Sequence, residues 1–228
     1  MIPLMVGVMK MPQHKAHGTS LVALVFTGAA GVATYGWHGS VDITASVLLA
    51  STAIITAGIG ANFSNTLPEW KLKRAFGWFL VVISSLLILK PSLPHEHAAI
   101  GGWPEIIILL LTGTFTGFLS GMMGIGGGGI MVVSMVLILG FTQYTAQGCS
   151  LLAMIPIGAV GALTYWRSRN VAVNILPGLI PGIVLGSFLG GSFAHLLPEV
   201  ALRVVFSAAL IFTGRKFLNA SRPKAEEI

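Results

Sequence analysis

The sequence predicts an all-α polytopic membrane protein made of two homologous helical repeats, and three observations lead to this fold class. Hydrophobic residues make up 54% of the chain and charged residues only 9%, whereas charged residues are about 25% of a typical soluble domain. Several apolar runs reach the roughly 20 residues that a helix needs to cross a bilayer. The chain also matches itself without a gap at an offset of 130 positions, as internal repeats do.

The self-alignment places Met1–Leu89 on Met131–Asn219 and keeps register over several short motifs. The sequence AHGTSL at Ala16–Leu21, for example, lies on AQGCSL at Ala146–Leu151. A helix-length apolar run and the glycine cluster Gly124–Gly129 precede the second copy, and their counterparts would fall before the first residue. We therefore expect that the first repeat lacks its leading helix, or else that the chain is a fragment or begins at a misassigned start.

Apolar segments of spanning length follow one another along both repeats. Two shorter runs, Met1–Met9 and Ile130–Gly140, are equivalent across the repeat and are expected to be half-helices or the ends of broken helices. The seven segments predicted to span are Gly18–Trp37, Ile43–Asn65, Leu72–Leu89, Pro104–Met123, Gly148–Trp166, Val171–Leu196 and Ala201–Leu218.

One polar, proline-containing stretch separates the two copies, and a charged tail ends the chain. Both halves must share one membrane core, so this stretch is a repeat boundary and not a linker between independent domains. The predicted organisation is an N-terminally truncated first transmembrane repeat at 1–90, an inter-repeat loop at 91–103, a second transmembrane repeat at 104–218 and a cytoplasmic tail at 219–228.

The distribution of Lys and Arg favours inverted repeats. If the short element of each repeat crosses the membrane, eleven of the 13 basic residues collect on one side and only Lys90 and Arg203 lie opposite. If it does not cross, the split is seven to six. Because basic residues concentrate on the cytoplasmic side, we expect inverted copies and a cytoplasmic C-terminus. The formal charge of +6 is then a topology signal, and no nucleic-acid partner is predicted.

The glycine cluster is the first candidate site. Glycines between an apolar helix and a short apolar continuation leave backbone N–H groups unpaired at membrane depth, which is tolerated where the backbone lines a cavity or meets protein. Such N–H groups at the start of a half-helix offer a positive dipole end to an anion. The alternative is that the glycines only permit close helix crossing. The predicted substrate-binding residues are Gly124, Gly126, Gly127 and Gly128.

Two equivalent turns form the second candidate site. Each lies at the start of a membrane segment, where a hydroxyl either caps the first helical turn or donates to an oxyanion. In inverted repeats, both turns would be able to face one cavity from opposite halves. The residues are Gly18, Thr19 and Ser20 in the first copy and Gly148, Cys149 and Ser150 in the second.

Asn174, Pro177 and Pro181 interrupt the segment after Val171, and the first copy has no prolines there. An interior proline removes a backbone hydrogen bond and kinks a helix. This site is predicted to be either a hinge or a packing accommodation.

Other chemistry finds little support. The adjacent ligands of His95-Glu96-His97 do not have the spacing of a metal site, no acidic residue falls at a membrane centre, and no serine has the partners of a protease. We predict no metal, no cofactor and no enzymatic activity. The expected partners are a small anionic substrate and the lipid bilayer. Further copies of the same chain, in a homo-oligomer, are a third candidate partner.

Several of these motifs resemble one known family. The sequence GMMGIGGGGIMVVSMVL at Gly121–Leu137, the AQGCSL motif and GIVLGSFLGGSF at Gly182–Phe193 are similar to the second half of the TauE/SafE sulfite exporter family, also called the toluene-sulfonate uptake permease family. AHGTSL resembles its first half, so the resemblance covers nearly the whole chain. The first-half glycine motif and leading helix of the family are absent, and its usual proline after the second glycine cluster is Val133 or Ser134 here.

The resemblance implies a multi-pass protein of the bacterial inner (plasma) membrane that moves sulfite, organosulfonates or related sulfur anions. We therefore expect an exporter of small anions that works by alternating access between two repeats. The alternative is a non-transporting membrane subunit or an incomplete transporter fragment.

Overall fold

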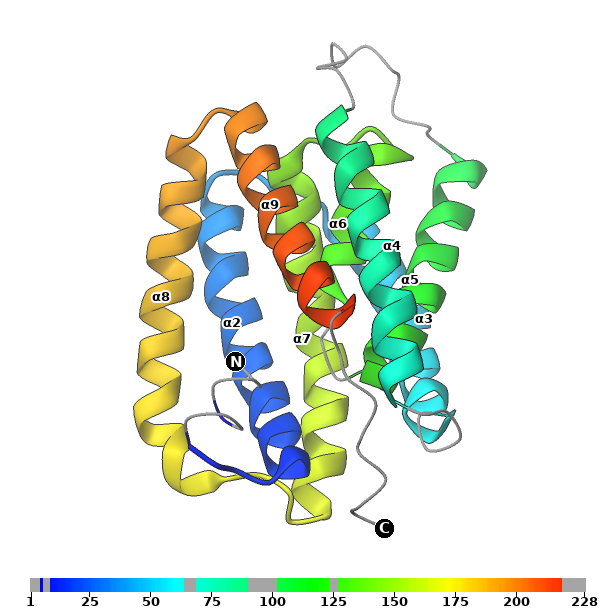
Figure 1. The fold of residues 1–228 in the computed structure, drawn as a ribbon. Coiled ribbons are helices and arrows are strands. Elements are labelled where there is room, and N and C mark those ends of the chain that lie inside the picture. The colour runs from blue at the N-terminus through cyan, green and yellow to red at the C-terminus, as the bar shows by residue number, and fades with distance from the viewer. Residues whose placement is uncertain (1–4, 6–8, 64–68, 90–101, 124–126, 219–228) are drawn as a thin grey trace.

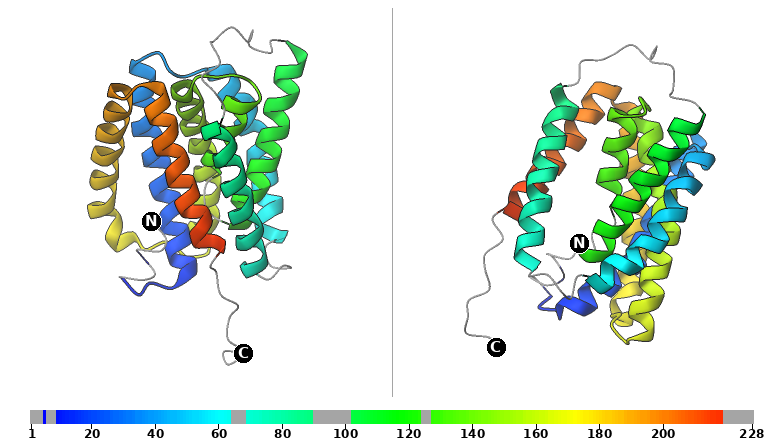
Figure 2. Two further views of the ribbon diagram at one scale, coloured as in Figure 1. Left: turned by 45° about the horizontal axis from the view of Figure 1, so that its top comes forward. Right: turned by 90° about the vertical axis from the view of Figure 1, so that its right-hand side faces the viewer.

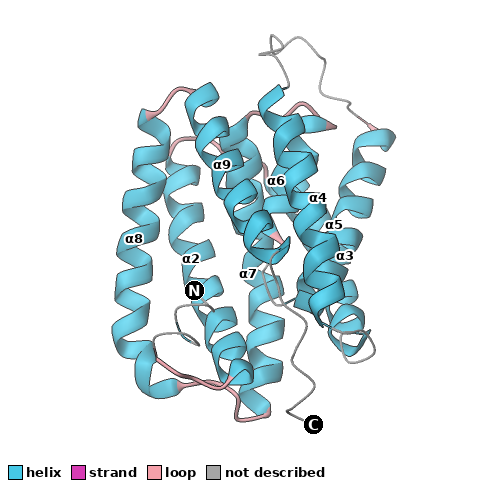
Figure 3. Ribbon diagram, viewed as in Figure 1, coloured by secondary structure: helices cyan, strands magenta, loops and turns pink. Residues whose placement is uncertain are grey.

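The computed structural model describes residue 5 and residues 9–63, 69–89, 102–123 and 127–218. The described residues form helices joined by loops, without a strand among them (Figures 1 and 3), which confirms the predicted all-α class. Most of the predicted inter-repeat loop, the predicted tail and all of Met1–Met9 except Met5 and Met9 lie outside these residues. The elements are α2 (Gln13–Trp37), α3 (Ile43–Phe63), α4 (Glu69–Leu89), α5 (Trp103–Met123), α6 (Gly128–Leu137), α7 (Gln143–Arg167), the 3-10 helix η2 (Val173–Ile175), α8 (Leu176–Leu196) and α9 (Glu199–Leu218).

Five described helices are long and apolar enough to span a membrane, namely α2, α3, α5, α7 and the η2–α8 segment. The sequence predicts seven. The two others, α4 and α9, are also helices of about 20 residues. Charged residues near both ends interrupt the apolar run of α9, and in α4 the apolar stretch of described side chains is Gly77–Ile88.

Glycines allow the helix backbones to approach closely, as in other membrane bundles. A Cβ added at Gly28 of α2 would lie 2.9 Å from the Leu151 carbonyl oxygen of α7, and one at Gly158 of α7 would lie 3.4 Å from that of Leu21 in α2. The later residue of α2 thus meets the earlier residue of α7, so these two helices are antiparallel.

Close glycine contacts also define how α4 packs on α9 and how α3 packs on α5. A Cβ at Gly77 of α4 would lie 2.7 Å from the Gly214 oxygen of α9, and these helices cross on one face of the bundle (Figure 2). In contrast, α3 and α5 are parallel. A Cβ at Gly113 would lie 2.4 Å from the Leu49 oxygen, and one at Gly117 would lie 2.3 Å from the Ala53 oxygen.

The short helix α6 lies inside the bundle and is the half-helix that the sequence predicts in this region. It spans 10 residues, and most of its side chains are buried. Its Met131 and Met135 join the main hydrophobic core with Leu49 of α3 and Cys149 of α7. Because it packs on α4, α5 and α7, its first turn starts within the protein (Figure 1).

Basic residues gather at one end of the bundle, the lower end in Figure 1. The helices α2 and α4 begin at this end, and α7 and α9 run toward it. Arg203, in contrast, lies near the start of α9, at the other end. The described basic residues of the first group are Lys10, Lys15, Lys71, Lys73, Arg74, Arg167, Arg169, Arg215 and Lys216.

The α3–α5 contact makes the first testable prediction. Gly117→Ala should lower the free energy of unfolding by about 1–3 kcal/mol, because its methyl group would overpack against the α3 backbone. Gly58→Ala, on the open face of α3 with no atom within 4 Å of an added Cβ, is the control and should leave stability equal or raise it by up to about 1 kcal/mol. Thermal unfolding in detergent measures both, and equal melting temperatures would contradict the contact.

Candidate functional site

The break between α5 and α6 is the strongest candidate site. Gly127 is the N-cap of α6 and has a φ of 59°, a left-handed conformation that favours glycine. The Ile130 and Met131 N–H groups both donate to the Gly127 carbonyl oxygen, at 3.0 and 3.3 Å. The chain therefore starts a new helix at Gly128, within the protein core. Gly124 and Gly126 of the predicted site lie outside the described residues.

Neighbouring helices surround the first turn of α6 closely. A Cβ at Gly127 would lie 2.3 Å from the Thr116 Cγ2 atom of α5, and one at Gly128 would lie 2.6 Å from the Met154 Sδ atom of α7. A Cβ at Gly129 would lie 2.9 Å from a methyl group of Leu210 in α9. Gly127 has the strongest need for glycine, because its φ is positive and an added Cβ would also lie 3.2 Å from the Thr116 carbonyl oxygen, whereas Gly128 and Gly129 face the ends of flexible side chains. The packing brings three helices to the α6 N-terminus.

The polar groups at this position suit an anion. The first N–H groups of any helix lack an intrahelical acceptor, and the helix dipole gives them a partial positive charge. Thr116 is only 1% exposed, and its hydroxyl has no hydrogen-bond partner among the described residues. Pro156 lies inside α7, two residues after Met154, and removes a helix hydrogen bond near the site. Chemically, the site offers neutral donors inside an apolar shell.

The structure places Thr19 and Cys149 in two equivalent contacts. The Ala172 N–H donates to the Thr19 Oγ1 atom at 2.9 Å, and the Asp42 N–H donates to the Cys149 Sγ atom at 3.2 Å. Both side chains are fully buried. The Thr19 contact therefore fixes the loop before η2, and the Cys149 contact fixes the loop before α3.

The neighbouring glycines have matching roles. A Cβ at Gly18 would lie 2.1 Å from the Asn170 oxygen, and one at Gly148 would lie 2.1 Å from the Ser40 oxygen. Only glycine allows these loops to approach so closely.

Two expectations for these turns were wrong. First, they do not cap helices, because α2 and α7 begin at Gln13 and Gln143, before the turns, and Thr142 is the residue that caps α7. Second, they do not face one cavity, because Gly18 packs on Tyr165 near the end of α7, whereas Gly148 lies near the start of that helix and packs on Ser40. The Ser150 hydroxyl donates to the Gln147 oxygen within its own helix.

The predicted hinge residues lie where η2 joins α8. Asn174 is in η2, and Pro177 is in the first turn of α8, where a proline costs no helix hydrogen bond. Pro181 is the only one of the three inside the helix. All three side chains are exposed. Because only Pro181 lies inside the helix, it is the one predicted hinge residue that can kink α8.

A second cavity was not predicted from the sequence. An open pocket of about 380 Å³ lies between α2, α7, α8 and α9. Its polar lining comes from Tyr35, Gln147 and Ser187, among mainly apolar side chains. The Tyr35 hydroxyl donates to the Gln147 Oε1 atom, and the Ser187 hydroxyl donates to the Thr27 carbonyl oxygen at 3.0 Å. No periodic signal in the sequence marks these residues, because they come from three different helices.

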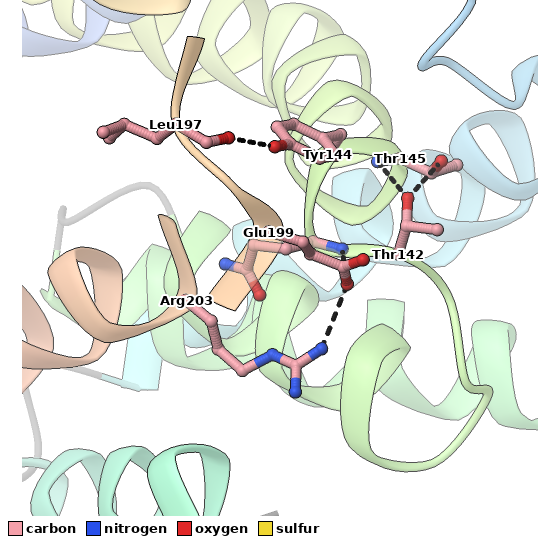
Figure 4. A network of polar contacts seen from close by, with 7 residues as sticks. Thr142, Tyr144, Thr145, Leu197, Glu199 and Arg203 are labelled. Atoms are coloured by element: carbon pink, nitrogen blue, oxygen red, sulfur yellow. Dashed lines mark hydrogen bonds and ion pairs between the residues drawn. The ribbon is translucent and has the colours of Figure 1, made fainter. Parts of the chain in front are cut away.

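A polar network fixes the start of α7 against the start of α9 (Figure 4). The Glu199 carboxylate accepts the Gln143 N–H at 3.1 Å and pairs with Arg203 at 3.0 Å. The Tyr144 hydroxyl donates to the Leu197 oxygen, and the Thr142 hydroxyl accepts the Thr145 N–H. These partners explain how charged side chains fit beside an apolar bundle, since paired charges cost less to bury.

The loop contacts of Thr19 make a second prediction. Thr19→Val keeps the side-chain volume but leaves the partly buried Ala172 N–H without the Thr19 hydroxyl as acceptor, so it should cost about 1 kcal/mol of stability. Thr19→Ser retains the oxygen and should cost clearly less. Melting temperatures in detergent compare the two variants, and an equal loss for both would assign the effect to packing.

The comparisons with known proteins agree with this architecture. The family model "Sulfite exporter TauE/SafE" matches residues 1–217. The chain is 24% identical over 207 residues to the "Probable membrane transporter protein YdhB" of Bacillus subtilis, which covers 89% of this chain and 83% of that protein. It is 26% identical over 214 residues to a "Probable membrane transporter protein" of Xylella fastidiosa, covering 90% and 82%. No solved structure matches the chain. With its family model matched over almost the whole length, this chain belongs to the TauE/SafE family of membrane transporters.

Proposed function

We propose that this chain exports small anions, namely sulfite, an organosulfonate or a related sulfur compound, across the bacterial inner membrane. The proposed mechanism is alternating access between two inverted halves around a site at the α6 N-terminus. Membership of a transporter family supports the transport function, and the chemistry of the site supports an anion.

The proposal of two inverted halves draws on helix positions and directions. The helices α2 and α7 begin 130 residues apart, at Gln13 and Gln143, and α4 and α9 do so at Glu69 and Glu199. Both pairs run antiparallel, as inverted copies would. The equivalent contacts of Thr19 and Cys149 also obey this offset. Rocking of one half against the other would then expose a central site to each side in turn.

The interrupted α5–α6 segment is the observation that carries the anion proposal. A half-helix that begins inside the protein presents N–H groups and a positive dipole end without a buried Lys or Arg. The oxygens of sulfite or a sulfonate group accept such hydrogen bonds, which would replace part of the hydration shell. Because these donors are neutral, the anion would be held without a full opposite charge and would be able to leave again. Gly124 and Gly126 are proposed to belong to this site with Gly127 and Gly128.

The one-sided concentration of basic residues supports a cytoplasmic C-terminus. Under the positive-inside rule, the end of the bundle toward which α7 and α9 run would face the cytoplasm. The turns at Gly18 and Gly148, at opposite ends of the α2–α7 pair, would then lie near opposite membrane surfaces. Because their contacts with the neighbouring loops are buried, we propose that these turns keep the loops in place while access to the site alternates.

The buried Thr116 hydroxyl provides a sharp test of the site. Thr116→Val removes a hydroxyl that has no hydrogen-bond partner in the described part of the chain, so stability should stay equal or rise by about 1 kcal/mol. If that hydroxyl binds the anion, the KM for sulfite or methanesulfonate transport should rise about tenfold, since a hydrogen bond to a charged group contributes about 1.5–3 kcal/mol. Uptake and efflux of labelled anion in proteoliposomes measure this.

Thr114→Val is the matched control on the same helix, because the Thr114 hydroxyl is exposed and bonded to the Leu110 oxygen. Unchanged transport in Thr116→Val would remove the anion site from the α6 N-terminus. Absence of anion transport in the unmodified chain would count against the transport proposal itself.

A further inference from the structure

One face of α8 has no partner among the described residues. Only 6% of the η2–α8 segment is buried inside the protein, against 28–39% for the other four spanning helices. The glycines Gly182, Gly186 and Gly190 follow one another at intervals of four along this helix, and each is exposed with no atom within 4 Å of an added Cβ. In Figure 1, α8 forms the left edge of the bundle and packs on α2.

The equivalent face of α3 shows what covers such a surface. An offset of 130 relates Gly182, Gly186 and Gly190 to Thr52, Thr56 and Gly60. The Thr52 hydroxyl donates to the Leu110 oxygen of α5 at 3.0 Å. The Thr56 Oγ1 atom lies 2.4 Å from a Cβ built on Gly117, and a Cβ at Gly60 would lie 2.1 Å from the Phe118 oxygen. All three positions of α3 are therefore in contact with α5.

Part of the helix arrangement repeats across the two proposed halves. The α2–α8 contact corresponds to the α7–α3 contact, and both are present. The α3–α5 contact, the most extensive one between described helices, has no counterpart among the described helices. The counterpart would lie on the open face of α8.

The open pocket is continuous with this face. Gly186 and Gly190 line both the exposed surface and the pocket of about 380 Å³. Beyond the glycines, the pocket reaches Tyr35 and Phe206 on α2 and α9. A helix that lay on the glycine face would therefore also close the mouth of this pocket.

We propose that the Gly182-Gly186-Gly190 face of α8 binds one additional transmembrane helix, beyond those formed by the described residues. That helix is apolar, carries small residues four positions apart like Gly113 and Gly117 of α5, and runs parallel to α8. Small residues at this spacing allow close backbone packing within a bilayer, where apolar attraction alone does not select a partner. This inference rests on the two-half arrangement proposed above.

A spin label tests the proposal without measuring transport, so its failure is distinguishable from failure of the proposed function. Three single-cysteine variants are made in a Cys149→Thr background, which places at 149 the residue type found at the equivalent position 19. Gly186→Cys reports on the open face. Thr56→Cys is its covered equivalent on α3. Phe188→Cys lies on another face of α8, whose equivalent in α3, Gly58, stays open.

The added partner is a synthetic peptide with the sequence of Trp103–Met123, reconstituted with the protein in proteoliposomes. The control peptide carries Gly113→Leu and Gly117→Leu. Oxygen accessibility and mobility of the label are measured by EPR. We expect the first peptide to lower the oxygen accessibility and the mobility of the label at Gly186→Cys to the values measured at Thr56→Cys. The same peptide should leave both quantities unchanged at Phe188→Cys. The control peptide should change neither quantity at any position.

Three outcomes would overturn the proposal. The first is no change at Gly186→Cys, which would assign the face to lipid. The second is an equal change at Gly186→Cys and Phe188→Cys, which indicates non-specific association. The third is spin–spin broadening at Gly186→Cys without peptide that grows with protein density, which would assign the face to a second copy of this chain. Gly182→Cys is the second reporter if Gly186→Cys does not fold.

Discussion

Close backbone contact between antiparallel α2 and α7 is the constraint on which the rest of the structure depends. Glycines on both helices let the backbones approach, and the polar atoms of Thr19 and Cys149 then reach the loops before η2 and α3. Each helix of the pair thus positions the chain that follows the other. A side chain at Gly18 or Gly148 would push away the loop that the neighbouring side chain holds. Packing and hydrogen bonding are therefore coupled at both ends of one helix pair.

This central pair also creates the setting for the candidate site. Met154 of α7 meets the first turn of α6, and α5 and α9 cover the remaining sides of that turn. The start of α6 is thereby enclosed, and its dipole acts in an environment of low dielectric, where it interacts more strongly with an anion. The site needs no charged side chain. A neutral site also avoids the cost of burying a Lys or Arg in the membrane.

Much of the fold could be predicted from the sequence, because spanning helices have a compositional signal that depends only on local residues. The half-helix after the glycine cluster was also predictable, since glycines mark a break in an apolar run. The role of Thr19 and Cys149 could not be predicted, because their hydrogen-bond partners are backbone N–H groups more than 100 residues away in the sequence. The pocket near Tyr35 and Gln147 was missed for the same reason.

The most direct test of the account is the sidedness of two equivalent turns. His38 follows α2 and Ser168 follows α7, and both residues are exposed. Cysteines at these positions in a Cys149→Thr background can be labelled with a membrane-impermeant maleimide in intact and in permeabilised cells. Inverted halves predict that His38→Cys reacts in intact cells and that Ser168→Cys reacts only after permeabilisation. Reaction of both cysteines from the same side would contradict the inverted arrangement and, with it, the proposed mechanism of alternating access.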